Sequence, residues 1–158
     1  MNAVTVLHYG HMFVLHSIKD LPHSQWYTGG ACGWWSVKDI IAHLASFEHT
    51  LTDVFKSLEG ETDTPMLHEW MKLGDDFGDV LVRRSEDKSS DVVLAEYMDA
   101  FEESFHYAKQ FPVEKYSQAG ILPWYGDEYD LDDFLVYTFY GHKREHGAQL
   151  ASFRDSLT

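Results

Sequence analysis

The sequence is short of cysteine and of apolar runs. Cys32 is the only cysteine among 158 residues, which excludes an internal disulfide framework and metal sites built on several cysteines. His8, His11, His16 and Lys19 interrupt the first twenty residues, so these lack the apolar core of a secretory signal. No stretch approaches the ~18 apolar residues of a membrane span. We therefore expect a cytoplasmic protein, in which a lone cysteine stays reduced.

Positive charge is also scarce. The chain has 12 Lys and Arg against 26 Asp and Glu, a net charge of −14 with neutral histidines. A chain this acidic repels phosphate backbones and anionic lipid headgroups. We therefore expect no nucleic acid and no membrane as partner, although the charge points to no particular substrate.

The chain does have the length of one domain, residues 1–158, and a strong helical periodicity. Apolar residues recur at helical spacing in four segments, at roughly 2–21, 36–60, 90–111 and 130–156. The second segment opens on Ser36 and Asp39, a capping-box pattern, and ends at Gly60. Because strand-like alternation is scarce, the pattern predicts an all-α fold, an up-and-down four-helix bundle.

The connection between the second and third predicted helices, residues 60–89, is too long for a plain turn. It contains several apolar side chains, among them Leu67, Trp70 and Phe77. We therefore expect a partly ordered lid over one side of the bundle, with a short helix near 75–84.

Helical phases divide the ten histidines into inward and outward ones. With about 100° per residue, Phe47 and Val54 fall within about 40° of His43, which places His43 on the apolar face of the second helix. His49 falls about 240° away and faces solvent. His16 and His106 likewise point outward from their helices.

On the fourth helix, His142 and His146 lie within about 40° of each other and share a face with Leu150. Two imidazoles one turn apart can bind the same metal ion. On the first helix, His11 lies among apolar residues and is a candidate to support such a site from behind its ligands.

The inward histidines allow two interpretations. Each could be a core residue satisfied by hydrogen bonds. Alternatively, His43, His142 and His146 share one metal ion, Zn²⁺ or Ni²⁺ by ligand type, with a coordination position left open as in catalytic sites.

Residues 142–146 also read H-x-x-E-H, the motif of inverted zinc proteases. Those enzymes take an acidic ligand well downstream, and only a dozen residues come after His146 here, so we do not adopt that assignment. Glu145 is a candidate catalytic base toward water. It could instead be a surface carboxylate beside Lys143 or Arg144.

Two stretches resemble signatures of the DinB-like superfamily. Residues 33–44, GWWSVKDIIAHL, are similar to its W-S-x-K-D-hydrophobic-x-x-H-L motif, and residues 140–150, YGHKREHGAQL, to its last-helix H-x-x-x-H-x-x-Q motif. The resemblance spans essentially the whole chain. It implies a four-helix bundle with an interior metal site on His43, His142 and His146, and it makes a homodimer an expectation.

The resemblance implies a class of function more than a substrate. Members include hydrolases and transferases or isomerases that use a low-molecular-weight thiol, so we expect a metal-dependent enzyme of stress response or detoxification that acts on a small electrophile. One alternative is a non-catalytic bundle that binds a small ligand or a protein. Another is a metal-free hydrolase like the colibactin-resistance branch, which the acidic–aromatic run Asp75-Asp76-Phe77 resembles.

Overall fold

The computed structural model describes residues 2–158, which form helices and turns with only an isolated bridge between Cys32 and Trp35. The prediction of an all-helical fold is confirmed. Its long helical segments are α1 (Ala3–Ile18), α2 (Val37–Leu58), α5 (Ser90–Gln110) and the continuous run α6 (Leu131–Phe134), η4 (Leu135–Tyr140) and α7 (Gly141–Ser156). Short 3₁₀ turns, η1 (His23–Gln25) and η3 (Val113–Lys115), lie in the connections. Within the described residues, no helix combines the length and apolar character needed to cross a membrane.

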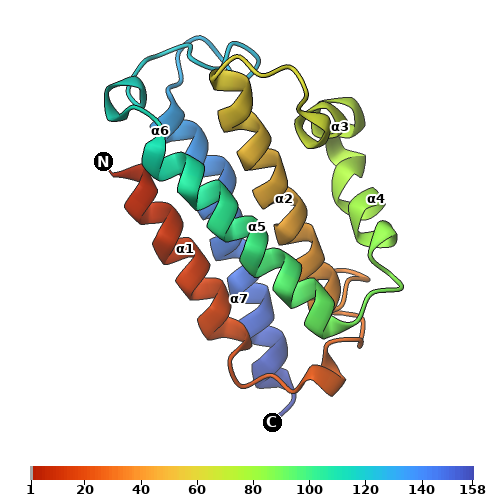
Figure 1. Ribbon diagram of the computed structural model, residues 1–158. Coiled ribbons are helices and arrows are strands. Elements are labelled where there is room, and N and C mark those ends of the chain that lie inside the picture. The colour runs from red at the N-terminus through yellow and green to blue at the C-terminus, as the bar shows by residue number, and fades with distance from the viewer. Residues whose placement is uncertain (1) are drawn as a thin grey trace.

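The long helices lie side by side, with α2 against α5 and α1 against α7 (Figure 1). In this view α1 and α7 run from the upper to the lower end, whereas α2 and α5 both run from the lower to the upper end. The direction therefore does not simply alternate along the chain, as a strict up-and-down order would require. The reason is the connection between α2 and α5, which returns the chain to the end where α2 begins.

Local sequence explains where α2 begins. The side chain of Ser36 accepts a hydrogen bond from the amide of Asp39, and the carboxylate of Asp39 accepts one from the amide of Ser36. This reciprocal capping box satisfies two amides that the helix leaves unpaired. The boundary predicted from sequence is thus confirmed.

The connection between α2 and α5 is more ordered than we predicted. It contains α3 (Pro65–Leu73), the 3₁₀ turn η2 (Gly74–Asp76) and α4 (Phe77–Arg84), of which only α4 was expected. The carboxylate of Asp53 in α2, 7% exposed, accepts hydrogen bonds from the amides of Met66 and Leu67 at 2.7 and 3.1 Å. A residue distant in sequence therefore caps α3, which has no local side-chain cap.

The far end of α4 is attached to α2 by a buried lysine. The ammonium group of Lys38 donates to the main-chain carbonyls of Ser85, Glu86 and Lys88, at 2.9 to 3.3 Å. A cation at the carboxyl end of a helix is favoured by the helix dipole and by the unpaired carbonyls there. Asp53 and Lys38 together hold the connection against α2.

The fourth helical segment is not regular. Residues Leu135–Tyr140 form a π-helix, in which the amide of Gly141 bonds to the carbonyl of Val136, five residues earlier. A π turn takes up an extra residue and rotates the helix after it relative to the helix before it. The sequence predicted one continuous α-helix over 130–156, so this irregularity directly before His142 was not foreseen.

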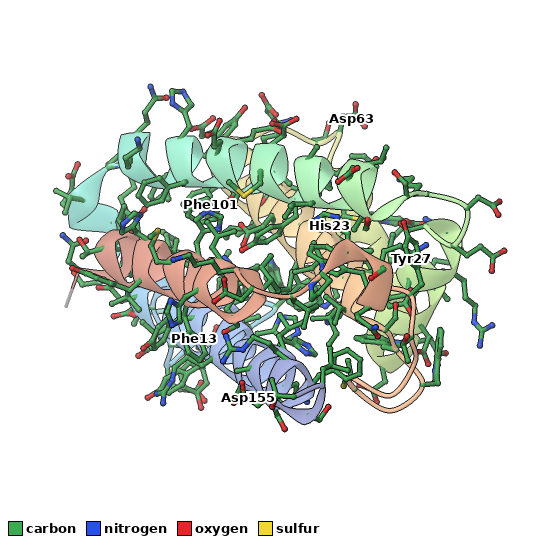
Figure 2. All side chains as sticks on the ribbon, turned by 90° about the horizontal axis from the view of Figure 1, so that it is seen from below. Phe13, His23, Tyr27, Asp63, Phe101 and Asp155 are labelled. Atoms are coloured by element: carbon green, nitrogen blue, oxygen red, sulfur yellow. The ribbon has the colours of Figure 1, made fainter. Side chains whose placement is uncertain are left out.

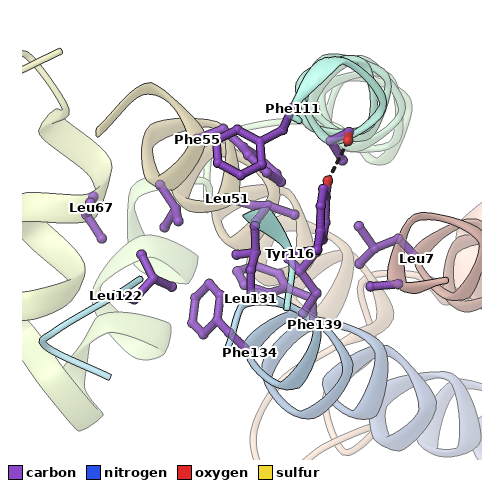
Figure 3. Close-up of a cluster of buried hydrophobic side chains, with 14 residues drawn as sticks. Leu7, Leu51, Phe55, Leu67, Phe111, Tyr116, Leu122, Leu131, Phe134 and Phe139 are labelled. Atoms are coloured by element: carbon purple, nitrogen blue, oxygen red, sulfur yellow. Dashed lines mark hydrogen bonds between the residues drawn. The ribbon is translucent and has the colours of Figure 1, made fainter. Parts of the chain in front are cut away.

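Two apolar clusters form the core. One surrounds Leu51, Phe55 and Phe134 at the end where α2 stops, and the hydroxyl of Tyr116 closes it by donating to the carbonyl of Ala108 (Figure 3). The other, at the opposite end, includes Trp26, Ile40 and Tyr97. The inward histidines stand between these clusters on the side of α4.

Candidate metal centre

Three histidines converge at the contact between α2 and α7. His43 comes from α2, and His142 and His146 lie one turn apart on α7. Each offers a ring nitrogen, and these nitrogens lie within 4.8 Å of one another. This spacing suits one ion with metal–nitrogen bonds of about 2.0–2.1 Å. The three residues that the sequence predicted are thus brought together.

Hydrogen bonding alone does not account for this arrangement. The Nε2 of His142 lies 2.8 Å from that of His43 and 2.9 Å from that of His146. A ring nitrogen carries either one proton or one lone pair, so the Nε2 of His142 makes no more than one linear hydrogen bond. A cation, in contrast, accepts the lone pairs of all three nitrogens at once.

The imidazoles are held neutral, as metal ligands must be. Burial, with a smaller contribution from His146, lowers the pKa of His43 to about 3. Burial and then the neighbouring His43, His146 and Lys143 lower the pKa of His142 to about 2. Burial also lowers the pKa of His146, although its bond to Gln149 and the nearby Glu145 oppose this.

The hydrogen-bond partner of His146 and the chemistry of the three ligands also fit a metal site. The Nδ1 of His146 lies 2.8 Å from the amide oxygen Oε1 of Gln149, which accepts only, so Nδ1 carries the proton and Nε2 keeps its lone pair. The donor set is three neutral imidazoles, which suits Zn²⁺ or Ni²⁺ better than a hard cation such as Mg²⁺.

The helix α4 and the loop before α2 cover the centre on one side. The indole of Trp35 packs on His43 with ring centroids 4.7 Å apart, and its Nε1 donates to the carboxylate of Asp79 at 2.9 Å. Gly78 comes so close that a Cβ there would lie 3.1 Å from Trp35 and 3.2 Å from the ring of His43. Glycine therefore permits the close approach of α4 to the histidines.

A pocket of about 310 Å³ opens beside the centre. Its wall includes two of the histidines, His43 and His142, and four aromatic side chains, and its rim carries the carboxylates of η2 and α4. The lining residues are Trp35, His43, Phe47, Trp70, Gly74, Asp75, Phe77, Gly78, Asp79 and His142. The chain can thus present a small molecule to the open side of a bound ion, under the lid that the sequence predicted.

Other predicted residues lie elsewhere. Glu145 is exposed and does not line the pocket, because its position between His142 and His146 turns it about 100° from the shared face. Geometry therefore gives no support to Glu145 as the base. His49, His16 and His106 are exposed, as predicted.

His11 is buried, but its hydrogen-bond partner is not one of the three histidines. Its Nδ1 lies 2.9 Å from the hydroxyl of Tyr97, and its ring stacks on Phe101 with centroids 3.7 Å apart. Phe101 points from α5 into the space between α5 and α1 (Figure 2). Burial first, and then Lys143, lower the pKa of His11 to about 4. His11 thus bonds to Tyr97, and the residue that bonds to a histidine of the centre is Gln149.

The sequence reasoning missed several residues at this centre. Trp35, Gly78 and Asp79 meet only because the connection between α2 and α5 folds back on the histidines. The pair Trp34-Trp35 before the capping box and the acidic run at 75–76 were visible in the sequence, but no spacing rule connects them to His43.

The chain matches no protein-family model, no curated protein and no solved structure. What the centre does is therefore argued from its geometry.

We expect the substitution Gly78→Ala to weaken metal binding about tenfold or more, because the added methyl group pushes α4 or the His43 ring out of place. Titration against a chelating dye would measure this change. Gly141→Ala is the matched control, since a Cβ there meets only the carbonyl of Val136 at 3.5 Å, an ordinary contact, although it adjoins His142. Equal affinities for the two variants would contradict the prediction.

Proposed function

We propose that this chain is a metal-dependent enzyme of the DinB-like superfamily, with the four-helix bundle of that family, that acts on a small electrophile. The observation that supports this most directly is the convergence of three neutral imidazole nitrogens from two helices beside an aromatic pocket. Zn²⁺ or Ni²⁺ bound there would act as a Lewis acid and lower the pKa of a water or a low-molecular-weight thiol. The reaction is accordingly hydrolysis or thiol transfer.

The residues of the chain have separate tasks in this proposal. His43, His142 and His146 hold the ion, and Gln149 keeps His146 in the tautomer that binds it. Trp35 and the lid helix α4 restrict the access of bulk water, and the aromatic side chains Phe47 and Trp70 orient the substrate. We also propose that two copies pair through the outer face of α1, which has no Asp, Glu, Lys or Arg.

The test is the metal content of untagged protein purified without added metal. We expect about one ion per chain in the wild type and almost none in the variant His142→Ala/His146→Ala, because one imidazole does not retain the ion through purification. Elemental analysis by mass spectrometry measures this, and circular dichroism shows whether each protein is folded.

The matched control is His16→Ala/His49→Ala, which removes two exposed histidines. It should keep the wild-type metal content. Equal, substoichiometric metal in all three proteins would refute the metal site. If the metal-free protein still hydrolysed p-nitrophenyl acetate at the wild-type rate, the metal-free hydrolase would be the better interpretation.

A further inference from the structure

We infer that the pocket beside the histidines binds a small organic cation, so that the substrate carries a positively charged group. The inference rests on the proposed function only in naming this cation a substrate. The binding itself is a consequence of the charges and rings that line the pocket.

The charge of the pocket wall has one sign. Of the described residues, Asp75 and Asp79 are the only ones with a charged side chain that line it. The two arginines of α4 are engaged elsewhere. Arg83 lies over the ring of Trp34 at 5.0 Å, and Arg84 forms a two-pronged ion pair with Glu69 at 2.6 and 2.8 Å. An anion entering this pocket would meet the carboxylates of Asp75 and Asp79 and no cationic side chain.

Aromatic rings form the rest of the wall. Phe47 lies between Trp70 and Phe77, with ring centroids 6.1 and 5.7 Å away, and Trp35 stands beside His43. The faces of such rings attract cations, most strongly those of tryptophan, and cages of this composition recognise quaternary ammonium groups. A pocket with aromatic walls and carboxylates at its rim therefore favours an organic cation over a neutral apolar molecule.

The carboxylate of Asp79 is held in place. One of its oxygens accepts the hydrogen bond from the indole of Trp35, whose ring also contacts His43. The position of this charge is therefore tied to the wall of the pocket and to the histidines. A free surface carboxylate would have no such restraint.

Like charges repel, so an ion on the histidines and an organic cation would occupy opposite ends of the pocket. The cationic group belongs beside Asp75 and Asp79, at the rim. The electrophilic end of the same molecule then points toward His43 and His142. The inferred substrate is therefore a small molecule with a cationic end and an electrophilic end.

The test compares choline with 3,3-dimethylbutan-1-ol, which has the same shape without the charge. We expect the full-length protein to bind choline at least tenfold more tightly, measured by calorimetry at low ionic strength. Asp75→Asn and Asp79→Asn should each weaken choline binding about fivefold and leave the alcohol unchanged. Asn at position 79 keeps an oxygen that can accept the bond from Trp35.

Asp76→Asn is the matched control, because Asp76 lies in the same turn as Asp75 but does not line the pocket. It should bind choline like the wild type. Equal affinity for the two probes, no binding of either, or an equal loss in Asp76→Asn would overturn the inference.

The titration is repeated after EDTA treatment, which separates this inference from the proposed function. The metal content is measured on the same protein before the treatment. A preference for choline in protein that holds no metal before EDTA treatment would support the cation pocket and overturn the metalloenzyme. Protein that holds one ion but binds both probes equally would do the reverse.

Discussion

Replacing Lys143 by methionine should lower the free energy of unfolding by about 3–5 kcal/mol, because it leaves a buried carboxylate without its counter-charge. Lys143 of α7 is 2% exposed and pairs with Glu48 of α2, which is 1% exposed. The paired atoms have no other hydrogen-bond partner among the described residues. After the loss of Lys143, the buried Glu48 carboxylate keeps only the hydroxyl of Ser104 as a partner and has no counter-charge. Urea unfolding at pH 7.5 measures the loss.

Removing both charges together should cost much less. The double variant Glu48→Leu/Lys143→Met replaces the pair by apolar side chains of similar size, which is often neutral or stabilising. Ser104, which donates to Glu48 at 2.5 Å, keeps a second acceptor in the carbonyl of Phe101. We therefore expect unfolding within about 1 kcal/mol of the wild type.

Lys109→Met is the control, because Lys109 is exposed on α5 and its loss should change stability by less than about 0.5 kcal/mol. If Lys143→Met and Lys109→Met proved equally stable, the ion pair would contribute nothing. If the double variant were as unstable as Lys143→Met, packing rather than charge would explain the loss.

In the metal-free protein, the free energy of unfolding should fall already between pH 6.5 and 5, which is above the pH range in which carboxylates titrate. Burial holds the pKa values of His11, His43 and His142 at about 4, 3 and 2, against 6.5 in the unfolded chain. These imidazoles take up their protons only on unfolding, so stability is highest above pH 6.5 and falls as the pH drops toward the folded-state values. The limiting slope is about 1.36 kcal/mol per pH unit and group, and each unfolded imidazole is already half protonated at pH 6.5, so the three together lose about 5 kcal/mol between pH 6.5 and 5.

This loss is comparable to the whole stability of a small domain, about 5–15 kcal/mol. Urea unfolding in EDTA at intervals from pH 8 to pH 5 measures it. His142→Gln should reduce the slope, because one of the buried imidazoles whose pKa lies below the unfolded value is gone. His49→Gln, which removes an exposed histidine, should leave the slope unchanged. A free energy that is flat from pH 6.5 to 5 would contradict the burial of neutral imidazoles.

The helices were predictable because their signals are local. Ser36 and Asp39 set the start of α2, as the structure confirms, and the helix ends at Leu58, two residues before the predicted stop at Gly60. The same periodicity predicted that His43, His142 and His146 face inward. This prediction held because α2 and α7 are regular α-helices, with about 100° per residue. Spacing thus predicted which three histidines face inward, whereas their convergence at one point depends on the packing of α7 against α2.

The connection between α2 and α5 was predicted only in part, because its structure depends on distant residues. Asp53 caps α3 from 13 residues before Met66, and Lys38 holds the residues after α4 from nearly fifty residues away. Neither contact has a local signature. The π-helix before His142 was missed for a related reason, since it accommodates the packing of the whole segment rather than a preference of single residues.

The sequence by itself determined the helical segments, their caps and the inward set of histidines, because periodicity and capping act within one or two turns. Only the tertiary structure decided the buried pair Glu48–Lys143. On α2, Glu48 lies about 140° from His43, whereas on α7 Lys143 lies only about 60° from His146. Both charges are buried because α5 covers Glu48 and because α1 and α5 cover Lys143. The tertiary structure also placed Asp75 and Asp79, and not Glu145, in the wall of the pocket beside the histidines. Which charged residues line a site depends on how distant segments of the chain pack together, and the helical periodicity of a single segment does not predict this.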